Sequence, residues 1–190
     1  MPSKNMSLKQ KFENEIAAEL KKKLGLGNIY QIPKIEKVVV NCGIGRLVSG
    51  EDKKSQKNQV LDEVSELLSL ITGQKPRLNQ AKKSIAGFKL RQGETIGLSV
   101  TLRGQRMYDF LERFLNLVLP QVRDFRGIPQ KSVSQNGILN FGIKEHIVFP
   151  ETMEKDFSRL YGLQITVVPQ VRDRDQALEL YQLMSFPFQR

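Results

Sequence analysis

The segment from Thr95 to Leu102 alternates strictly along its length. Isoleucine, leucine and valine occupy every second position, and threonine, serine and glycine occupy the positions between them. A β-strand directs successive side chains to opposite faces, so a period of two indicates a strand with one packed face. The pattern predicts a sheet that is covered on one side and presents small polar groups on the other.

Other segments carry the helical period. At the N-terminus, Ser7 and Gln10 have the spacing of a capping box, and apolar residues then recur every four positions up to Leu24. Gly25 and Gly27 follow as stop signals. Helices are predicted over 8–24, from about Asp52 to Gly73, from Gly104 to Pro120, and after Asp173 with Gln176 in a capping position.

Further strands are predicted at 35–41, near 88–91, at 138–143 and at 163–168. Strand, helix, two strands, helix and strand is the order of a ferredoxin-like split βαβ sandwich. The expected class is therefore α+β, with an antiparallel-containing sheet, helices on one face, an added N-terminal helix, and a C-terminal strand and helix. No repeat or linker divides the chain, which predicts a single RNA-binding domain over 1–190.

The charge of the chain is concentrated in one window. Lysine and arginine number 30 against 20 acids, a net charge of +10. Between Lys75 and Arg106 there are eight basic residues and one acid, Glu94, so this window alone carries +7. A solvated face is the ordinary explanation of a basic run, but four interspersed glycines let backbone approach a ligand. We expect a basic loop at about 76–93 that contacts phosphates of a polyanion.

The rare residues exclude several classes of site. With one cysteine and one histidine, the chain has neither a disulfide framework nor a histidine-rich or cysteine-rich metal centre. No metal and no cofactor are expected. No run of apolar residues is long enough to span a membrane, and no apolar signal segment follows the first methionine. These features predict a cytoplasmic protein without a membrane partner.

Two local motifs allow an enzymatic interpretation. The Asn41–Gly45 turn follows a strand, but Val48 replaces the third glycine of a dinucleotide fingerprint and there is no Gly-Lys-Ser/Thr loop. Gly43 and Gly45 can equally let the backbone approach an RNA sugar-phosphate. Cys42 and His146 lie on distant segments without an evident orienting third residue, so no catalytic site is predicted.

The aromatic content favours one mode of RNA recognition over another. Aromatic residues make up 7% of the chain and tryptophan is absent. The Thr95–Thr101 face also lacks the paired aromatics on which many sheet-based readers stack bases. Phosphate contacts, with small polar groups such as Asn41 and Thr101 reading 2′-hydroxyls, are therefore expected to dominate.

Several runs together resemble the bacterial-type family of large-subunit ribosomal protein five. They are QIPKIEKV at 31–38, NCGIG at 41–45, TGQKP at 72–76, AKKSIAGFKLRQG at 81–93, VTLRG at 100–104, RDFRG at 123–127 and FPF at 186–188. The motifs occur in order over nearly the whole chain. Cys42 departs from the bulkier residue expected there, and the loop from Arg46 to Lys57 is longer than usual.

The resemblance implies a non-enzymatic protein that binds 5S rRNA in the central protuberance, beside other 5S rRNA-binding proteins of the large subunit. It also implies contact with the P-site tRNA and a bridge to small-subunit ribosomal protein thirteen. The expected 5S rRNA-binding residues are Asn41, Gly43, Gly45, Gln74, Lys75, Thr101 and Arg103. The loop expected to reach tRNA and the small subunit carries Lys82, Lys83, Ser84, Lys89 and Arg91. The alternatives are an RNA-binding regulator outside the ribosome and a nucleotide-binding enzyme built on the Gly43–Gly45 turn.

Overall fold

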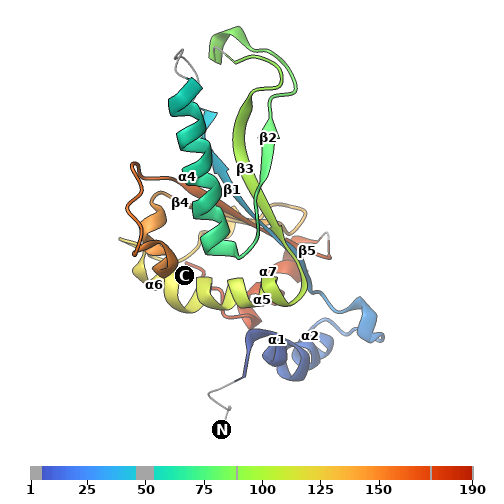
Figure 1. Ribbon diagram of the computed structural model, residues 1–190. Helices are drawn as coiled ribbons and strands as arrows, with labels where there is room; N and C mark the ends of the chain where they lie inside the picture. The colour runs from blue at the N-terminus through green and yellow to red at the C-terminus, as the bar shows by residue number, and fades with distance from the viewer. Residues whose placement is uncertain (1–5, 46–53, 89, 172, 190) are drawn as a thin grey trace. The chain divides into compact units, whose positions relative to one another are not determined.

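The computed structural model describes residues 6–45, 54–88, 90–171 and 173–189, and has the predicted α+β fold (Figure 1). Five strands form one sheet in the order β2-β3-β1-β5-β4. β3 lies between β1 and β2, the two strands that α4 connects, and pairs antiparallel with β2, as a split βαβ unit requires. The strands are β1 (Ile35–Gly43), β2 (Arg77–Gln80), β3 (Thr95–Leu102), β4 (Leu139–Ile143) and β5 (Leu163–Pro169).

The predicted helices form close to their expected positions. The first is built from α1 (Leu8–Lys11), a π-helical turn η1 (Phe12–Ile16) and α2 (Ala17–Lys23). The third is built from α5 (Gly104–Arg113), η4 (Phe114–Val118) and α6 (Leu119–Gln121). The others are α4 (Lys54–Thr72) and α7 (Arg174–Leu183), with short 3-10 turns at η2 (Ile29–Gln31), η3 (Ala86–Phe88), η5 (Gln130–Ser132), η6 (His146–Val148) and η7 (Pro150–Thr152).

The π turn explains the spacing of the first helix. The Ser7 and Gln10 side chains form the predicted capping box, and Leu8, Phe12, Ile16 and Leu20 are all buried. A repeat of four residues drifts around an α-helix of 3.6 residues per turn. The wider η1 turn offsets this drift, so the apolar residues stay on one buried face of the helix.

One strand prediction is wrong. Ala86–Phe88 form the 3-10 turn η3, and Ile85 and Leu90 form an isolated antiparallel bridge, whereas the strand that pairs with β3 is Arg77–Gln80. Arg77, Leu78 and Gln80 are exposed and Asn79 is half-buried, so this edge strand shows no apolar alternation. Its backbone pairing with β3 decides its conformation, and the sequence carries no local signal of that pairing.

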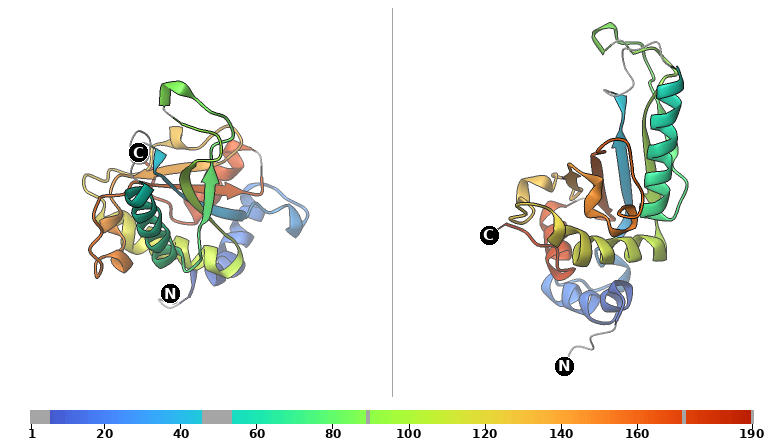
Figure 2. Two further views of the ribbon diagram at one scale, coloured as in Figure 1. Left: turned by 45° about the horizontal axis from the view of Figure 1, so that its top comes forward. Right: turned by 60° about the vertical axis from the view of Figure 1, so that its left-hand side comes forward.

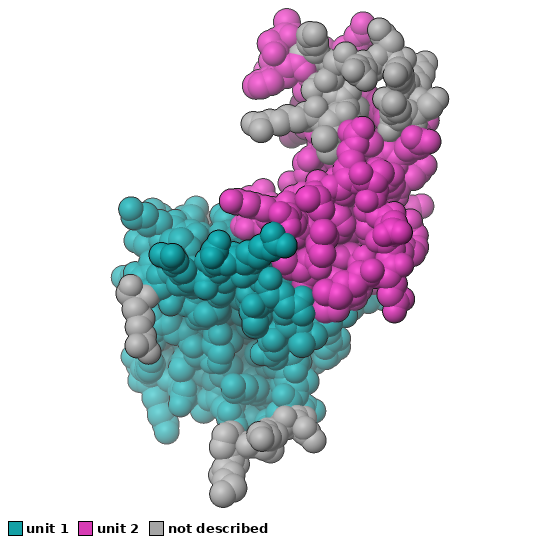
Figure 3. Space-filling model, turned by 90° about the vertical axis from the view of Figure 1, so that its left-hand side faces the viewer, with its two compact units in different colours: residues 1–38, 102–141, 166–190 teal, residues 39–101, 142–165 magenta. Residues whose placement is uncertain are grey.

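Contacts divide the chain into two compact units (Figure 3). Unit 1 comprises 1–38, 102–141 and 166–190, and unit 2 comprises 39–101 and 142–165. Each unit draws on separate stretches of sequence, so the division has no linker to mark it. The single RNA-binding domain predicted for 1–190 stays a prediction.

Unit 1 has an aromatic core with a buried polar anchor. The Tyr181 hydroxyl is fully buried and lies 2.8 Å from the carbonyl oxygen of Gly137 and 3.2 Å from that of Val167. Burial raises the pKa of this phenol well above its usual range. The hydroxyl therefore stays protonated and joins β5 to the turn before β4. Within the described residues, no helix is long and apolar enough to span a bilayer.

Unit 2 packs α4 along one side of its strands (Figure 2). Leu67 and Leu68 of α4 are fully buried, as are Val40 of β1 and Leu98 of β3. On the same helix, the Glu63 carboxylate accepts a hydrogen bond of 2.7 Å from the Tyr161 hydroxyl. These contacts cover one side of the strands, and α4 leaves the opposite side of β1, β2 and β3 uncovered.

His146 is a buried titratable group in unit 2. Its Nδ1 accepts a hydrogen bond of 3.1 Å from the Tyr161 backbone N–H, and its ring packs edge-on against Phe157. Burial lowers the pKa of the imidazole, although the Glu145 carboxylate partly opposes the shift. The folded chain therefore holds His146 neutral, with Nδ1 available as an acceptor.

Stability should consequently fall as the pH drops below about 6.5, the ordinary histidine pKa in an unfolded chain. The folded-state pKa is the lower of the two, so the unfolded chain takes up the proton first. The free energy of unfolding, measured with urea at pH 7.5, 6.5 and 5.5, should decrease across this series. His146→Gln, which does not titrate, should remove most of the decrease. An unchanged pH profile in that variant would contradict the assignment.

Candidate nucleic-acid interface

The side of the sheet opposite α4 carries the predicted polar face. On β1 and β3 the buried positions alternate, which leaves Asn41 and Ser99 half-buried and Thr101 exposed on the other side. No hydrogen bond joins the Asn41 side chain to another described residue. Its amide therefore remains available to a ligand. Asn41 and Gly43 of β1 and Thr101 of β3, three of the residues expected to bind 5S rRNA, lie on neighbouring strands.

β2 adds polar groups that were not predicted from the sequence. The register pairs Arg77 with Ser99 and Asn79 with Gly97, so these residues share one face. The Asn79 Nδ2 donates to the Ser99 Oγ at 3.1 Å. Arg77 is exposed at the start of the strand and contributes a cation to the face. Only the pairing of β2 with β3 could have revealed these positions. We call Asn41, Arg77, Asn79, Ser99 and Thr101 the polar face.

The glycines of β3 and of the end of β1 differ in how much room they leave for a side chain. A Cβ atom at Gly97 would lie 2.8 Å from the backbone oxygen of Cys42 on β1, closer than side chains approach. At Gly43 a Cβ atom would meet nothing within 4 Å, and at Gly45 it would lie 3.7 Å from the Ile96 oxygen. The end of β1 is tied to β3 by the Ile44 N–H, which donates to the Ile96 oxygen at 3.0 Å. Gly97 is therefore needed for strand packing, whereas Gly43 leaves open space beside the polar face.

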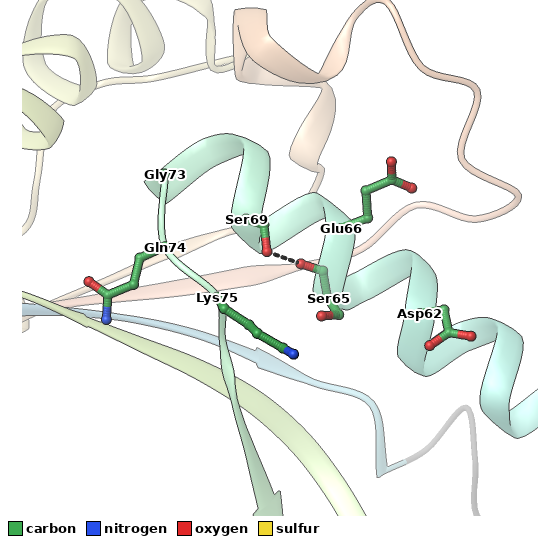
Figure 4. Close-up of a pocket in the computed structure, with 7 residues that line it drawn as sticks. All are labelled: Asp62, Ser65, Glu66, Ser69, Gly73, Gln74 and Lys75. Atoms are coloured by element: carbon green, nitrogen blue, oxygen red, sulfur yellow. Dashed lines mark hydrogen bonds between the residues drawn. The ribbon is translucent and has the colours of Figure 1, made fainter.

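Gln74 and Lys75 are adjacent but point in different directions (Figure 4). α4 ends at Thr72, Gly73 with a φ of +66° then turns the chain, and the Gln74 Nε2 donates to the Thr101 backbone oxygen at 3.5 Å. Lys75 instead points along α4 into an open hollow of about 590 Å³. That hollow is also lined by Asp62, Ser65, Glu66, Ser69 and Gly73. Gln74 thus joins the polar face through Thr101, while Lys75 points into a hollow whose lining includes Asp62 and Glu66.

Arg103 belongs to unit 1 and has an acidic partner. Its Nη1 lies 3.0 Å from the Glu36 Oε1. The hydrogen bond from Arg103 and the charge of Lys37 hold the pKa of the Glu36 carboxyl below its usual range. The ion pair is exposed, so solvent and salt screen it strongly. Arg103 remains able to exchange this partner for a phosphate.

The predicted basic loop is held at its base by the one acid in its window. Glu94 accepts a hydrogen bond of 2.9 Å from the Arg91 backbone N–H and one of 3.0 Å from the Lys57 ammonium of α4. Both contacts lower the pKa of the Glu94 carboxyl, with the backbone bond the larger cause. The Ser84 Oγ accepts from the Gln92 N–H at 2.9 Å, which closes the loop a second time. Ser84 thus has a structural contact in addition to its predicted role.

The tip of this loop is both basic and apolar. Lys82 and Lys83 are exposed, and so are Ile85 and Phe88, the latter by 71%. Phe88 was not predicted as a binding residue, although an aromatic residue within a basic run is a signal for nucleic-acid contact. Lys89 lies outside the described residues.

The alternative chemistry of Cys42 and the glycine turn gains no support from the geometry. Cys42 is fully buried, and burial raises the pKa of its thiol to about 11. The thiol is therefore protonated at neutral pH, while His146 is already bonded to the Tyr161 N–H. Across the described residues, no three histidine, cysteine or acidic side chains gather in a way that could hold a metal ion. The loop of 46–53, with Val48, lies outside them.

Comparison with known proteins agrees with the fold and the motifs. The family model described as Ribosomal protein L5 matches residues 28–91, and the model of the C-terminus of the same ribosomal protein family matches residues 95–188. Large ribosomal subunit protein uL5 of Carboxydothermus hydrogenoformans is 43% identical over 183 residues, which cover 96% of this chain and 98% of the relative. The chain belongs to the ribosomal protein L5 family.

Two further relatives have the same name. The proteins from Thermosipho africanus and Macrococcus caseolyticus are 45% and 46% identical over 183 residues, which cover 96% of this chain and 97% and 98% of the relatives. The resemblance noted from the motifs is confirmed. Because the L5 family is a structural, non-enzymatic one, the nucleotide-binding enzyme is excluded as an alternative.

Proposed function

We propose that this L5 family protein is a structural constituent of the large ribosomal subunit in the cytoplasm and that it binds 5S rRNA through the polar face. The relatives are named as large ribosomal subunit proteins. The observation that carries the proposal is the uncovered side of β1, β2 and β3, where small polar groups surround Gly43. No bulky side chain of β3 stands between this face and an approaching RNA backbone.

The chemistry of the polar face suits structured RNA. The amides of Asn41 and Asn79 and the hydroxyls of Ser99 and Thr101 can both donate to and accept from 2′-hydroxyls. Arg77 supplies a charge that can neutralise a phosphate, and its planar fork can bind two phosphate oxygens. The face carries no aromatic residue, so recognition proceeds by backbone shape and sugar contacts rather than by base stacking.

We assign the loop that follows β2 to a second contact. Its exposed Lys82 and Lys83 and its exposed Phe88 suit the phosphates and bases of the P-site tRNA. The same loop is a candidate bridge to small-subunit ribosomal protein thirteen. The Glu94 contacts with Arg91 and Lys57 keep the base of the loop in place while its tip extends. Other 5S rRNA-binding proteins of the large subunit are expected neighbours.

Asn41→Ala should weaken 5S rRNA binding about 2- to 12-fold, because one hydrogen bond at a desolvated contact contributes about 0.5 to 1.5 kcal/mol. The affinity is measured by filter binding of purified 5S rRNA to the full chain. Asn58→Ala is the matched control, since Asn58 is an exposed asparagine on α4. Equal affinities for the two variants would count against the polar face as the 5S rRNA site.

Replacing Lys82 and Lys83 together by alanine should leave 5S rRNA binding within about twofold of the parent, because neither lysine lies on the polar face. P-site tRNA affinity or subunit association should fall severalfold, since two phosphate-neutralising charges are lost. Both are measured on subunits reconstituted with the variant. Lys9→Ala with Lys11→Ala on α1 removes the same charge elsewhere. Strong loss of 5S rRNA binding in the loop variant would overturn the separation of the two contacts.

A further inference from the structure

A short turn in unit 1 exposes two apolar side chains to solvent. It consists of Asn28 and the 3-10 turn η2, and we call residues 28–31 the Tyr30 turn. Tyr30 is 89% exposed and Ile29 is 68% exposed. No other large apolar side chain in the described part of the chain is as exposed as Tyr30. The polar face and the basic loop, which belong to unit 2, do not account for this aromatic residue.

The exposure of Tyr30 is built into the backbone. The Asn28 Oδ1 accepts the Tyr30 N–H at 3.0 Å, and the Asn28 carbonyl oxygen accepts the Gln31 N–H at 3.2 Å. The Ile32 N–H donates to the Ile29 oxygen at 3.2 Å, and the Ile32 and Pro33 side chains that follow are buried. The turn is therefore capped at one end and anchored at the other. A partner would meet a ring whose backbone is already ordered, which lowers the entropic cost of binding.

The sequence on both sides of the Tyr30 turn is basic. Between Leu20 and Ile35 the sequence contains Lys21, Lys22, Lys23 and Lys34 and no acid. Lys23 is paired with Glu179 of α7 at 2.9 Å, whereas Lys22 and Lys34 are exposed. A protein docking site is typically apolar at its centre and depleted of lysine, and here the apolar centre is one aromatic ring among lysines. An aromatic platform flanked by cations is the arrangement that binds unpaired nucleic acid.

We propose that Tyr30 stacks on an unpaired base of large-subunit ribosomal RNA, with Lys22 and Lys34 contacting phosphates on either side of that base. This contact is distinct from the polar face in both chemistry and place. The polar face reads sugar and backbone without an aromatic residue, whereas the Tyr30 turn reads the π-face of one base. The inference rests on membership of the L5 family and not on the proposed 5S rRNA contact.

The test uses the full chain and isolated large-subunit ribosomal RNA freed of 5S rRNA, so that failure of the 5S rRNA proposal does not affect it. Tyr30→Ala should weaken filter binding by about 5- to 150-fold, the range expected for losing one base–aromatic stack. Tyr30→Phe should stay within about twofold of the parent, because the ring is retained. Met153→Ala is the matched control, since Met153 is 60% exposed but neighbours Glu154 and Asp156.

A second measurement reports stacking directly. The chain has no tryptophan, so Tyr30→Trp introduces a single indole whose fluorescence should be quenched by the RNA. Met153→Trp should remain unquenched. Equal loss of affinity in Tyr30→Phe and Tyr30→Ala would overturn stacking in favour of a hydroxyl contact. Undiminished RNA affinity in Tyr30→Ala, with loss of a protein from the assembled subunit, would overturn the RNA contact in favour of a protein partner.

Discussion

Raising monovalent salt from 50 to 200 mM will weaken 5S rRNA binding by this chain about 40-fold. The prediction follows from about three neutralised phosphates, each of which releases condensed counterions on binding. The cations expected at the 5S rRNA site are Lys75 and Arg103, and Arg77 of the polar face adds a third, whereas the basic residues of the loop are assigned to the second contact. Filter binding at five salt concentrations gives the slope of log affinity against log salt.

Arg77 is the most direct single test of that slope. It is exposed at the start of β2, on the same face as Ser99, and no ion pair joins it to another described residue. Arg77→Gln should reduce the slope by about one, because one phosphate contact is lost. Arg159→Gln, an exposed arginine in the segment after η7, is the control and should leave the slope unchanged. A salt-independent affinity would contradict binding by phosphate contacts.

Gly97→Ala will destabilise the chain and impair the polar face together. The added Cβ would lie 2.8 Å from the Cys42 backbone oxygen, so β1 and β3 must move apart. Overpacking of this kind costs about 1 to 3 kcal/mol. We expect a loss of that size in the free energy of unfolding measured with urea, and weaker 5S rRNA binding, since Asn41 and Ser99 lie on the strands that move.

Gly43→Ala is the matched control for packing and also tests the site. A Cβ atom at Gly43 meets nothing within 4 Å, and the φ of this residue is not positive, so stability should be unchanged. If RNA approaches the end of β1 as proposed, the added methyl group should still weaken 5S rRNA binding. Loss of stability in both variants, or in neither, would contradict the predicted clash at Gly97 and the open space at Gly43.

The sequence predicts helices and strands correctly where they follow from the spacing of neighbouring residues. The capping box at Ser7, the stop at Gly73 and the alternation over Thr95–Leu102 all depend on neighbours within a few positions, and each is confirmed. The strand predicted near 88–91 is wrong because the true edge strand, Arg77–Gln80, is specified by backbone pairing with a distant partner. Such a strand has no buried face of its own to reveal it.

In the candidate site, too, a residue was predictable where neighbouring residues decide its position and was missed where a distant partner does. Thr101 could be placed on a polar face from the sequence because strand alternation dictates which side it takes, and Asn41 was named as a small polar group at the end of the preceding strand. Arg77, Asn79 and Phe88 were missed, since a partner strand and a loop closed by Glu94 and Ser84 decide their exposure. Gln74 and Lys75 were predicted as neighbours in one site, but the turn at Gly73 sends their side chains to different surroundings.

Local sequence patterns determine which faces of the helices and strands are apolar, polar or basic. The spacing of apolar residues and the local net charge are properties of consecutive residues. The strand with one packed face, the helices and the +7 window therefore follow from composition and spacing alone. Which groups those faces bring together depends on the folded arrangement of the chain. Backbone pairing and burial bring together residues that are far apart in the sequence, such as Asn79 with Ser99 and Glu94 with Lys57. The same folded arrangement leaves the ring of Tyr30 exposed to solvent.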